Sequence, residues 1–176
     1  CCGDSYFFVE TEKHFICALA DGLGSGVYAM ESSRIVMDII KRNHTISVEE
    51  IVNLSNQMLI GKRGVVLGVL KIDFTMNTYS FWSIGNIGII TINKDREKVR
   101  NIPIAGYLSG YRRPIKVKSY KLEKGTTFIM YSDGVEDKEL SPCFYTNKNV
   151  KLITKAFELT SEKQRKDDTT LIAMRY

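Results

Sequence analysis

The segment Ile16-Cys17-Ala18-Leu19-Ala20-Asp21-Gly22-Leu23-Gly24-Ser25-Gly26 decides how this chain folds. Five apolar residues run directly into an aspartate, and glycines then alternate with other residues. An uninterrupted apolar run of this length indicates a buried strand. The Asp21-Gly22 step suits a sharp exit from that strand, because glycine tolerates unusual backbone angles. The segment therefore predicts a strand that ends on a carboxylate, beside a backbone left accessible by glycine.

Predicted strands lie on both sides of this segment. A polar link joins an aromatic strand over 4–10 to the apolar strand over 14–20, which predicts a hairpin. Beyond residue 64 the apolar period changes from 3.6 to 2, which is typical of successive strands. These later strands are predicted over 65–73, 78–84, 87–92, 98–104, 115–122, 127–132 and 169–176.

Helical spacing is confined to three places, residues 27–42, a segment that begins near 47, and residues 148–160. Ser47-x-x-Glu50 is a capping box, which marks the start of the second helix. We expect Ile51, Leu54 and Met58 to line the buried face of that helix. These elements predict one α+β domain over residues 1–176, a sandwich of antiparallel sheets with helices outside. Because the chain starts almost directly in a strand, we also expect that an N-terminal strand is missing.

Composition narrows the class of protein. The chain has 176 residues, a net charge of +5, 44% hydrophobic and 26% charged residues, which excludes a disordered or collagen-like chain. No apolar run approaches the roughly 18–20 residues of a membrane span. The four cysteines form no Cys-x-x-Cys pair, which argues against a zinc knuckle, and we expect ordinary buried thiols in a reduced, cytoplasmic protein. The mild positive charge favours acidic or phosphorylated partners, and nucleic acid is not expected because no aromatic residues interleave the basic ones.

Aspartates stand at the ends of the apolar strands. Asp4 opens the first strand, Asp21 ends the second, Asp133 follows a later one, and Asp167-Asp168 precede the last. A single Asp-Gly step after a strand is usually only a turn, and that reading stays open. If the strand ends converge, however, the carboxylates repel one another unless protons or divalent metal neutralise them. Oxygen ligands suit Mg²⁺ or Mn²⁺, and two such ions roughly 3.5–4 Å apart support phosphate hydrolysis.

Four segments together resemble the metal-dependent serine/threonine protein phosphatases of the PPM, or 2C-type, family. They are Gly3-Asp4-Ser5-Tyr6-Phe7, residues 20–26, Tyr131-Ser132-Asp133-Gly134 with the following 135–137, and Lys166-Asp167-Asp168-Thr169-Thr170. Their order and spacing match the compact SpoIIE-like branch. Residues 16–26, 62–64, 105–110 and 165–168 look like the phosphatases of that branch that reset the stressosome.

The resemblance implies an α-β-β-α sandwich with a metal site at one edge. Asp21, Asp133, Asp167 and the Gly22 carbonyl match the family's ligands for two Mn²⁺ or Mg²⁺ ions. Asp4 matches an aspartate near the metals that acts through water, and Asp168 stands beside the ligands where many relatives have asparagine. The implied reaction is hydrolysis of phosphoserine or phosphothreonine by water that the metals activate.

The resemblance also implies a cellular role. The expected substrates are phosphorylated stressosome scaffold proteins of the RsbS and RsbR type, and their dephosphorylation would give negative feedback on a general stress sigma factor. We expect a monomer that binds neither nucleic acid nor membrane.

The chain departs from the family in two places. Ser83-Ile84-Gly85-Asn86-Ile87-Gly88 occupies the segment where many members carry Gly-Asp-Ser, so the aspartate of a third metal is absent and two metals are expected. No phosphate-binding arginine stands near the start, which predicts modest turnover. A catalytically weak binding module with the same fold therefore remains the alternative.

Other constellations have simpler readings. Gly22-x-Gly24-x-Gly26 is not a dinucleotide fingerprint, and no arginine lies six positions after Cys17 or Cys143 as a cysteine phosphatase needs. His14 and His44 are expected to be structural, one at a strand turn and one at a helix end. Residues 107–114 are expected to form an exposed loop that contributes to substrate choice.

Overall fold

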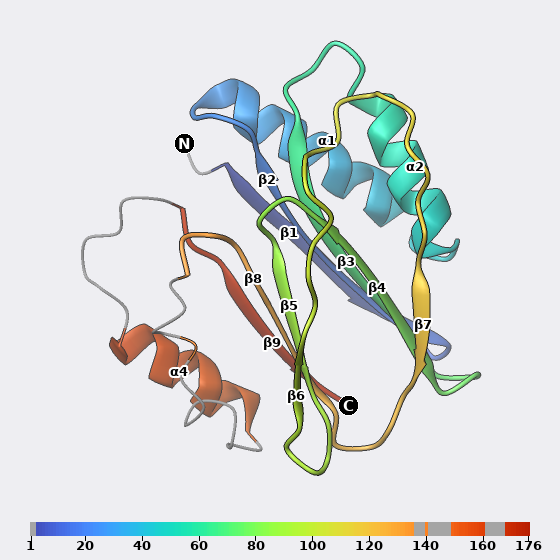
Figure 1. Cartoon of the computed structure of the whole chain (residues 1–176), viewed down its shortest axis with the longest axis vertical. Coiled ribbons are helices and arrows are strands. Elements are labelled where there is room, and N and C mark those ends of the chain that lie inside the picture. Colours follow the sequence, from blue (N-terminus) through green and yellow to red (C-terminus); the bar gives the residue numbers. More distant parts are fainter. Residues whose placement is uncertain (1–2, 136–139, 141–148, 161–167) are drawn as a thin grey trace.

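Two stacked antiparallel sheets form the centre of the molecule, with helices on both outer faces (Figure 1). The structure is a computed structural model that describes residues 3–135, 140, 149–160 and 168–176. The first sheet, sheet A, has the strand order β1-β2-β3-β4-β7, and the second, sheet B, has the order β6-β5-β8-β9. This is the predicted α-β-β-α sandwich. No helix in the described part of the chain is long and apolar enough to cross a membrane.

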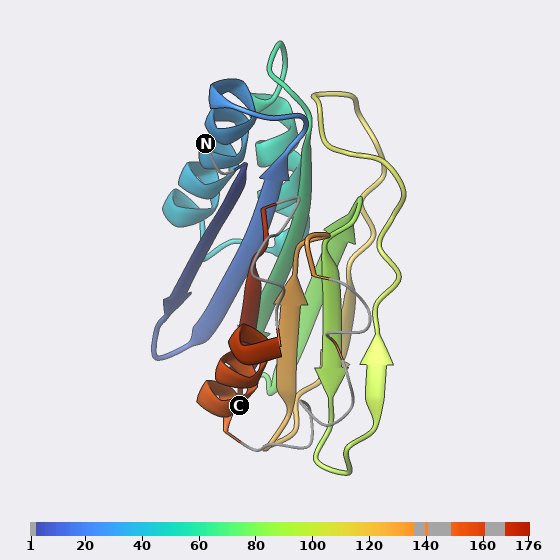
Figure 2. The same cartoon turned by 90° about the vertical axis from the view of Figure 1, so that its left-hand side faces the viewer.

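The strands have the following bounds: β1 Asp4–Glu10, β2 His14–Gly22, β3 Val65–Asp73, β4 Thr78–Ile84, β5 Gly88–Ile92, β6 Lys98–Arg100, β7 Lys118–Lys121, β8 Thr127–Tyr131 and β9 Leu171–Arg175. The helices are α1 Val27–Arg42, α2 Val48–Met58 and α4 Val150–Thr160. Helices α1 and α2 cover sheet A, and α4 packs on sheet B (Figures 1 and 2).

The middle of β2, residues 16–20, is apolar because both of its faces are buried. Successive side chains of a strand point to opposite faces. Ile16, Ala18 and Ala20 therefore pack under α1 and α2, whereas Cys17 and Leu19 pack between the two sheets. A rigid central strand of this kind fixes the position of Asp21 at its end.

Helix α2 begins as predicted but buries a different face. The hydroxyl of Ser47 accepts a hydrogen bond from the Glu50 backbone N–H at 3.2 Å, and the Glu50 carboxylate accepts one from the Ser47 N–H at 3.0 Å. The prediction for the buried face was wrong at two positions, since Leu54 and Met58 are 36% and 54% exposed. The buried residues follow the spacing i, i+3, i+4, i+7, i+8 from the first helical residue and include polar ones: Val48, Ile51, Val52, Ser55 and Asn56.

Two predicted strands are shorter than their apolar patterns. The strand predicted over 98–104 ends at Arg100, because Pro103 has no N–H to donate and Ile104 crosses to sheet A, where its N–H donates to the Ser83 carbonyl at 2.9 Å. The strand predicted over 115–122 contains only Lys118–Lys121. The segment between β6 and β7 is thus largely free of regular structure and lies along one edge of the sandwich (Figure 2).

Candidate metal centre

Asp4 and Asp21 face each other at the open end of the β1–β2 hairpin. The antiparallel register pairs the Cα atom of Asp4 directly with that of Asp21. Like charges at directly opposed positions destabilise a sheet when nothing neutralises them. The hairpin therefore places two carboxylates together at a cost that a cation would offset.

Gly3 brings a third carboxylate, that of Asp168, to the same place. The Gly3 backbone N–H donates to an Asp168 carboxylate oxygen at 2.5 Å. A Cβ atom added at Gly3 would lie 2.8 Å from Asp21 Oδ1, 3.5 Å from the Gly22 carbonyl oxygen and 3.7 Å from Asp168 Oδ2. The Gly22 carbonyl and the carboxylates of Asp21 and Asp168 thus surround one small space, although they come from different sheets.

Asp4 lies half-buried within this group of acids. Its Oδ2 accepts a hydrogen bond from the Thr170 hydroxyl at 2.7 Å, whereas its Oδ1 is buried and has no hydrogen-bond partner among the described residues. Burial raises the pKa of Asp4, and the carboxylates of Asp168 and Asp133 raise it further, against the opposing effect of the Thr170 hydroxyl that donates to it and of the nearby Ser132 hydroxyl. An orphaned carboxylate oxygen that is repelled by its neighbours suits a divalent cation.

Asp133 lies two residues after the end of β8 and is exposed. Its position is fixed by the preceding residue, because the Ser132 N–H donates to the Thr170 carbonyl at 3.0 Å and the Ser132 hydroxyl accepts from the Thr170 N–H at 2.9 Å. One Asp133 oxygen accepts a hydrogen bond from the Asn86 side chain at 2.5 Å. Asn86 thus contacts one of the predicted ligands from the segment in which the family's third-metal aspartate is absent.

Gly134 lets the segment after β8 approach the segment before β9 closely beside the centre. A Cβ atom at this position would lie 2.2 Å from the Asp168 carbonyl oxygen, and the Thr169 hydroxyl donates to the Gly134 carbonyl at 3.2 Å. The Asp133-Gly134 step therefore has a structural reason as well as a chemical one.

Four of the five predicted acidic residues meet at one end of the sandwich. The strand ends that carry Asp4, Asp21, Asp133 and Asp168 lie near the N label in Figure 1. Asp167 lies outside the described residues. Within the described part of the chain, no three His, Cys, Asp or Glu side chains are spaced to hold a metal ion by themselves. The ligand set, which includes the Gly22 carbonyl and Asp167, stays a prediction.

Sequence reasoning missed the polar side chains that hold the acids in place. Ser132, Thr170 and Asn86 are all hydrogen-bonded to the centre or to its strands. Ser132 and Thr170 stand next to the aspartates in the sequence, so their closeness to the metal centre could have been predicted. The position of Asn86 could not have been predicted, because only the folded chain brings the β4–β5 turn to the end of β8.

The histidines also form a contact that the sequence did not predict. His14 Nε2 lies 3.0 Å from His44 Nδ1, so the start of β2 is linked to the turn after α1. His14 lies at the start of β2 and His44 just after α1, as predicted, and the purely structural role of the two stays a prediction.

Comparison with known proteins gives the class. The family model for stage II sporulation protein E (SpoIIE) matches residues 11–176. The chain therefore belongs to the SpoIIE family, and it is a phosphatase of the PPM type, as predicted.

Particular relatives are closely similar. The chain is 36% identical over 171 residues to the phosphoserine phosphatase RsbX of Bacillus subtilis (strain 168), covering 97% of this chain and 85% of that protein. A crystal structure of RsbX in complex with magnesium superposes with a TM-score of 0.89 at 35% identity, over 98% of this chain and 86% of that one. A chain from a structure of the bacterial stressosome has the same fold, with a TM-score of 0.84 at 20% identity, over 98% of this chain and 90% of that one.

Proposed function

We propose that the chain hydrolyses phosphoserine and phosphothreonine in proteins at the candidate metal centre. The observation that carries this proposal is the convergence of carboxylates from both sheets on one space, with a buried Asp4 oxygen that has no hydrogen-bond partner among the described residues. A cluster of this kind is suited to bind divalent cations and has no evident structural purpose without them. The likeness to RsbX, a phosphoserine phosphatase, supports the same reaction.

The proposed ligands are Asp21, Asp133, Asp167 and the Gly22 carbonyl, which would hold two Mn²⁺ or Mg²⁺ ions. Such ions, when bound, lower the pKa of water and neutralise phosphoryl oxygens during in-line attack. Asp4 and Asp168 lie beside these ligands and would orient solvent and backbone, since Asp168 already accepts the Gly3 N–H. The RsbX structure with magnesium supports metal dependence. The number of ions is our proposal.

We propose phosphorylated stressosome proteins of the RsbS and RsbR type as substrates, so that the enzyme would act in the cytoplasm as negative feedback on stress signalling. The likeness to RsbX, a phosphoserine phosphatase, supports a phosphorylated serine as the target, and the resemblance of residues 16–26, 62–64, 105–110 and 165–168 to stressosome phosphatases supports the class of substrate. The exposed position of Asp133 suits a phosphorylated side chain presented on the surface of a folded protein.

Hydrolysis of a small aryl phosphate tests the reaction without assuming a protein substrate. We expect turnover with Mn²⁺, loss of turnover with a chelator, and a fall of at least about 100-fold in Asp21→Asn and Asp133→Asn, because each removes a charged ligand. Asp38→Asn is the matched control, since Asp38 is exposed on α1 away from the centre.

Two outcomes would contradict the proposal. Full activity in Asp21→Asn and Asp133→Asn would exclude the metal mechanism. Absence of any turnover, together with retained binding to a phosphorylated scaffold protein, would favour the alternative of a catalytically weak binding module.

A further inference from the structure

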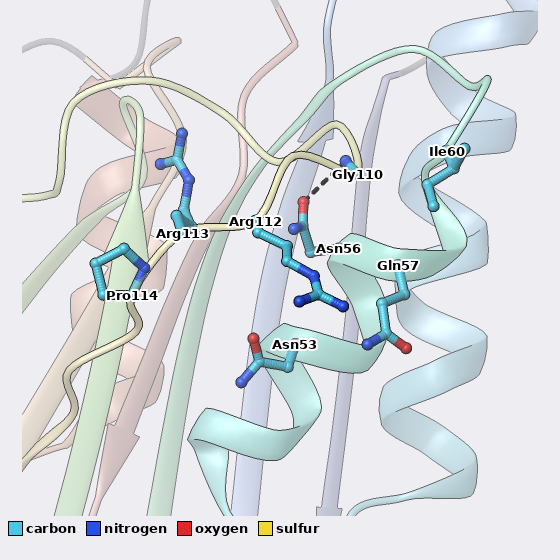
Figure 3. A pocket seen from close by; sticks show the side chains of 8 residues that line it. All are labelled: Asn53, Asn56, Gln57, Ile60, Gly110, Arg112, Arg113 and Pro114. Atoms are coloured by element: carbon cyan, nitrogen blue, oxygen red, sulfur yellow. Dashed lines mark hydrogen bonds between the residues drawn. The ribbon is translucent and has the colours of Figure 1, made fainter.

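A groove of about 700 Å³ lies outside the metal centre, between the C-terminal half of α2 and residues 110–114 (Figure 3). None of the predicted ligands lines it. It is formed by a helix and by part of the irregular segment that connects β6 to β7, so it has an origin separate from that of the acidic cluster.

The wall of the groove is fixed before anything binds. Asn56 is only 5% exposed, and its side-chain oxygen accepts hydrogen bonds from the N–H groups of Ser109 at 3.1 Å and Gly110 at 2.9 Å. Its amide nitrogen donates to the Tyr111 carbonyl at 2.8 Å. Just before this turn, Leu108 pairs with Val65 of β3 through two hydrogen bonds of 2.9 Å. Because hydrogen bonds already hold this wall in place, a ligand can bind in the groove without a large entropic cost of ordering the loop.

The side chains that line the groove are cationic and amide-bearing. Figure 3 shows the Arg112 guanidinium reaching over α2 toward Asn53 and Gln57, while Arg113 points away along the other side of the turn. No carboxylate lines the groove, and neither arginine forms an ion pair within the described residues. Guanidinium groups bind carboxylates well, and exposed amides match the N–H and C=O groups of a peptide backbone.

Exposed apolar residues occur in or next to the segments that form the groove: Ile60 lines it, Met58 follows the lining residue Gln57, and Tyr111 stands between the lining residues Gly110 and Arg112. Met58, Ile60 and Tyr111 are 54%, 70% and 80% exposed. Tyrosine, methionine and arginine are the residue types enriched in the centres of protein interfaces. This composition favours a protein segment over a nucleic acid, which would require a longer cationic track with stacking platforms.

A backbone hydrogen bond and a side-chain contact join the loop after Asp21 to the segment that leads into the groove wall. The N–H of Leu23, two residues after Asp21, donates to the Gly64 carbonyl at 2.8 Å. A Cβ atom at Gly64 would lie 2.4 Å from the Tyr107 ring, so Gly64 contacts the segment that leads into the groove wall. A chain bound in the groove therefore lies on the same side of the molecule as the loop that follows Asp21.

We propose that this groove docks an acidic segment of the phosphoprotein substrate, away from the phosphorylated residue itself. The inference rests on the proposed phosphatase function and adds to it a determinant of substrate choice. Arg112 is the main contact for the carboxylates, and Asn53 and Gln57 pair with the backbone of the docked segment.

Binding of unphosphorylated peptides tests the docking site without any reaction. The probes are dye-labelled decapeptides, one of alternating Glu and Ser and one of alternating Gln and Ser, followed by fluorescence anisotropy. We expect the Glu peptide to bind wild-type protein and to bind Arg112→Gln about tenfold more weakly, the size of one charge-assisted hydrogen bond. Arg112→Lys should recover part of the affinity, and added salt should weaken binding.

Lys116→Gln is the matched control, because it removes one exposed positive charge outside the groove. An equal loss in Lys116→Gln would show attraction by net charge alone and overturn the proposal. So would equal affinity of the two peptides for wild-type protein, or Arg112-dependent binding of a decameric oligothymidylate as tight as that of the Glu peptide. Aryl phosphate turnover is measured on the same samples. Groove binding without turnover contradicts the proposed function, and turnover without groove binding contradicts the docking site.

Discussion

Asp4 shows at the scale of one residue how the site is balanced between stability and binding. Its carboxylate is half-buried, one of its oxygens has no hydrogen-bond partner in the part of the chain that the structure describes, and burial together with Asp168 and Asp133 raises its pKa. Folding therefore brings together carboxylates whose mutual repulsion destabilises the metal-free protein. Such a loss of stability is expected at a site whose residues are arranged to bind a ligand.

Asp4→Asn should shift stability and metal binding in opposite directions. Without metal, removal of the repelled charge should raise the free energy of unfolding by on the order of 0.5 kcal/mol after solvent screening. The affinity for Mn²⁺ should fall at the same time. Urea unfolding in chelator and calorimetric titration with Mn²⁺ measure the two effects. A variant that is less stable without metal would show that Asp4 is structural.

The aspartates were predictable from the sequence, whereas the groups around them were not. Each aspartate adjoins an apolar strand, so periodicity placed it at a strand end. The convergence of Asp21 with Asp168 also depends on how the two sheets stack. The family resemblance predicted that convergence better than the apolar periodicity of the strands did. Asn56 and Asn86 had no signal, because their partners are more than 45 positions away along the chain.

Helix α2 illustrates the element scale. Its start was predicted correctly because a capping box is local, but its buried face was not, because tertiary contacts place Asn56 inward and leave Met58 exposed. The buried Asn56 holds the wall of the groove in place by hydrogen bonds. A polar residue on the buried face of the helix therefore has a structural role.

Ser47→Ala should weaken this helix start. Loss of the hydroxyl leaves the Glu50 N–H without its acceptor, which should lower the free energy of unfolding by about 1 kcal/mol. Urea unfolding with an unchanged m-value measures the loss. Ser119→Ala, at an exposed position of β7, is the control and should change stability by only a few tenths of a kcal/mol. Equal stability of the two variants would mean that the box contributes nothing.

The His14–His44 contact links two elements and gives a pH dependence. Burial lowers the pKa of His14, and Lys71 and His44 lower it further, against the opposing effect of Asp73. The folded protein therefore binds fewer protons than the unfolded chain near the ordinary histidine pKa of about 6.5. The contribution of neutral His14 to the free energy of unfolding is fully present above that pH. It is lost as the pH falls through the lowered pKa of His14.

Urea unfolding at pH 7.5 and pH 5.5 measures this effect. We expect a lower free energy of unfolding at pH 5.5, and a smaller difference between the two pH values in His14→Gln, which keeps a donor and an acceptor but does not titrate. An unchanged pH difference in His14→Gln would contradict a role for the histidine pair.

At the scale of the whole molecule, the sandwich provides a rigid frame with chemistry at one end. Three apolar clusters hold the layers: one between the helices and sheet A, one between the sheets, and one between sheet B and α4. The acids come from both sheets, so the centre forms only when the sheets stack. The groove beside α2 lies on a different set of elements, which allows substrate choice and catalysis to vary separately.

The most direct test of the central claim is a crystal structure of the protein grown with Mn²⁺, with anomalous scattering recorded at the manganese edge. Our account predicts two anomalous peaks within coordination distance of the carboxylates of Asp21, Asp133 and Asp167 and of the Gly22 carbonyl. A well-ordered end of the sandwich with no peak there, or with manganese bound only elsewhere, would contradict it.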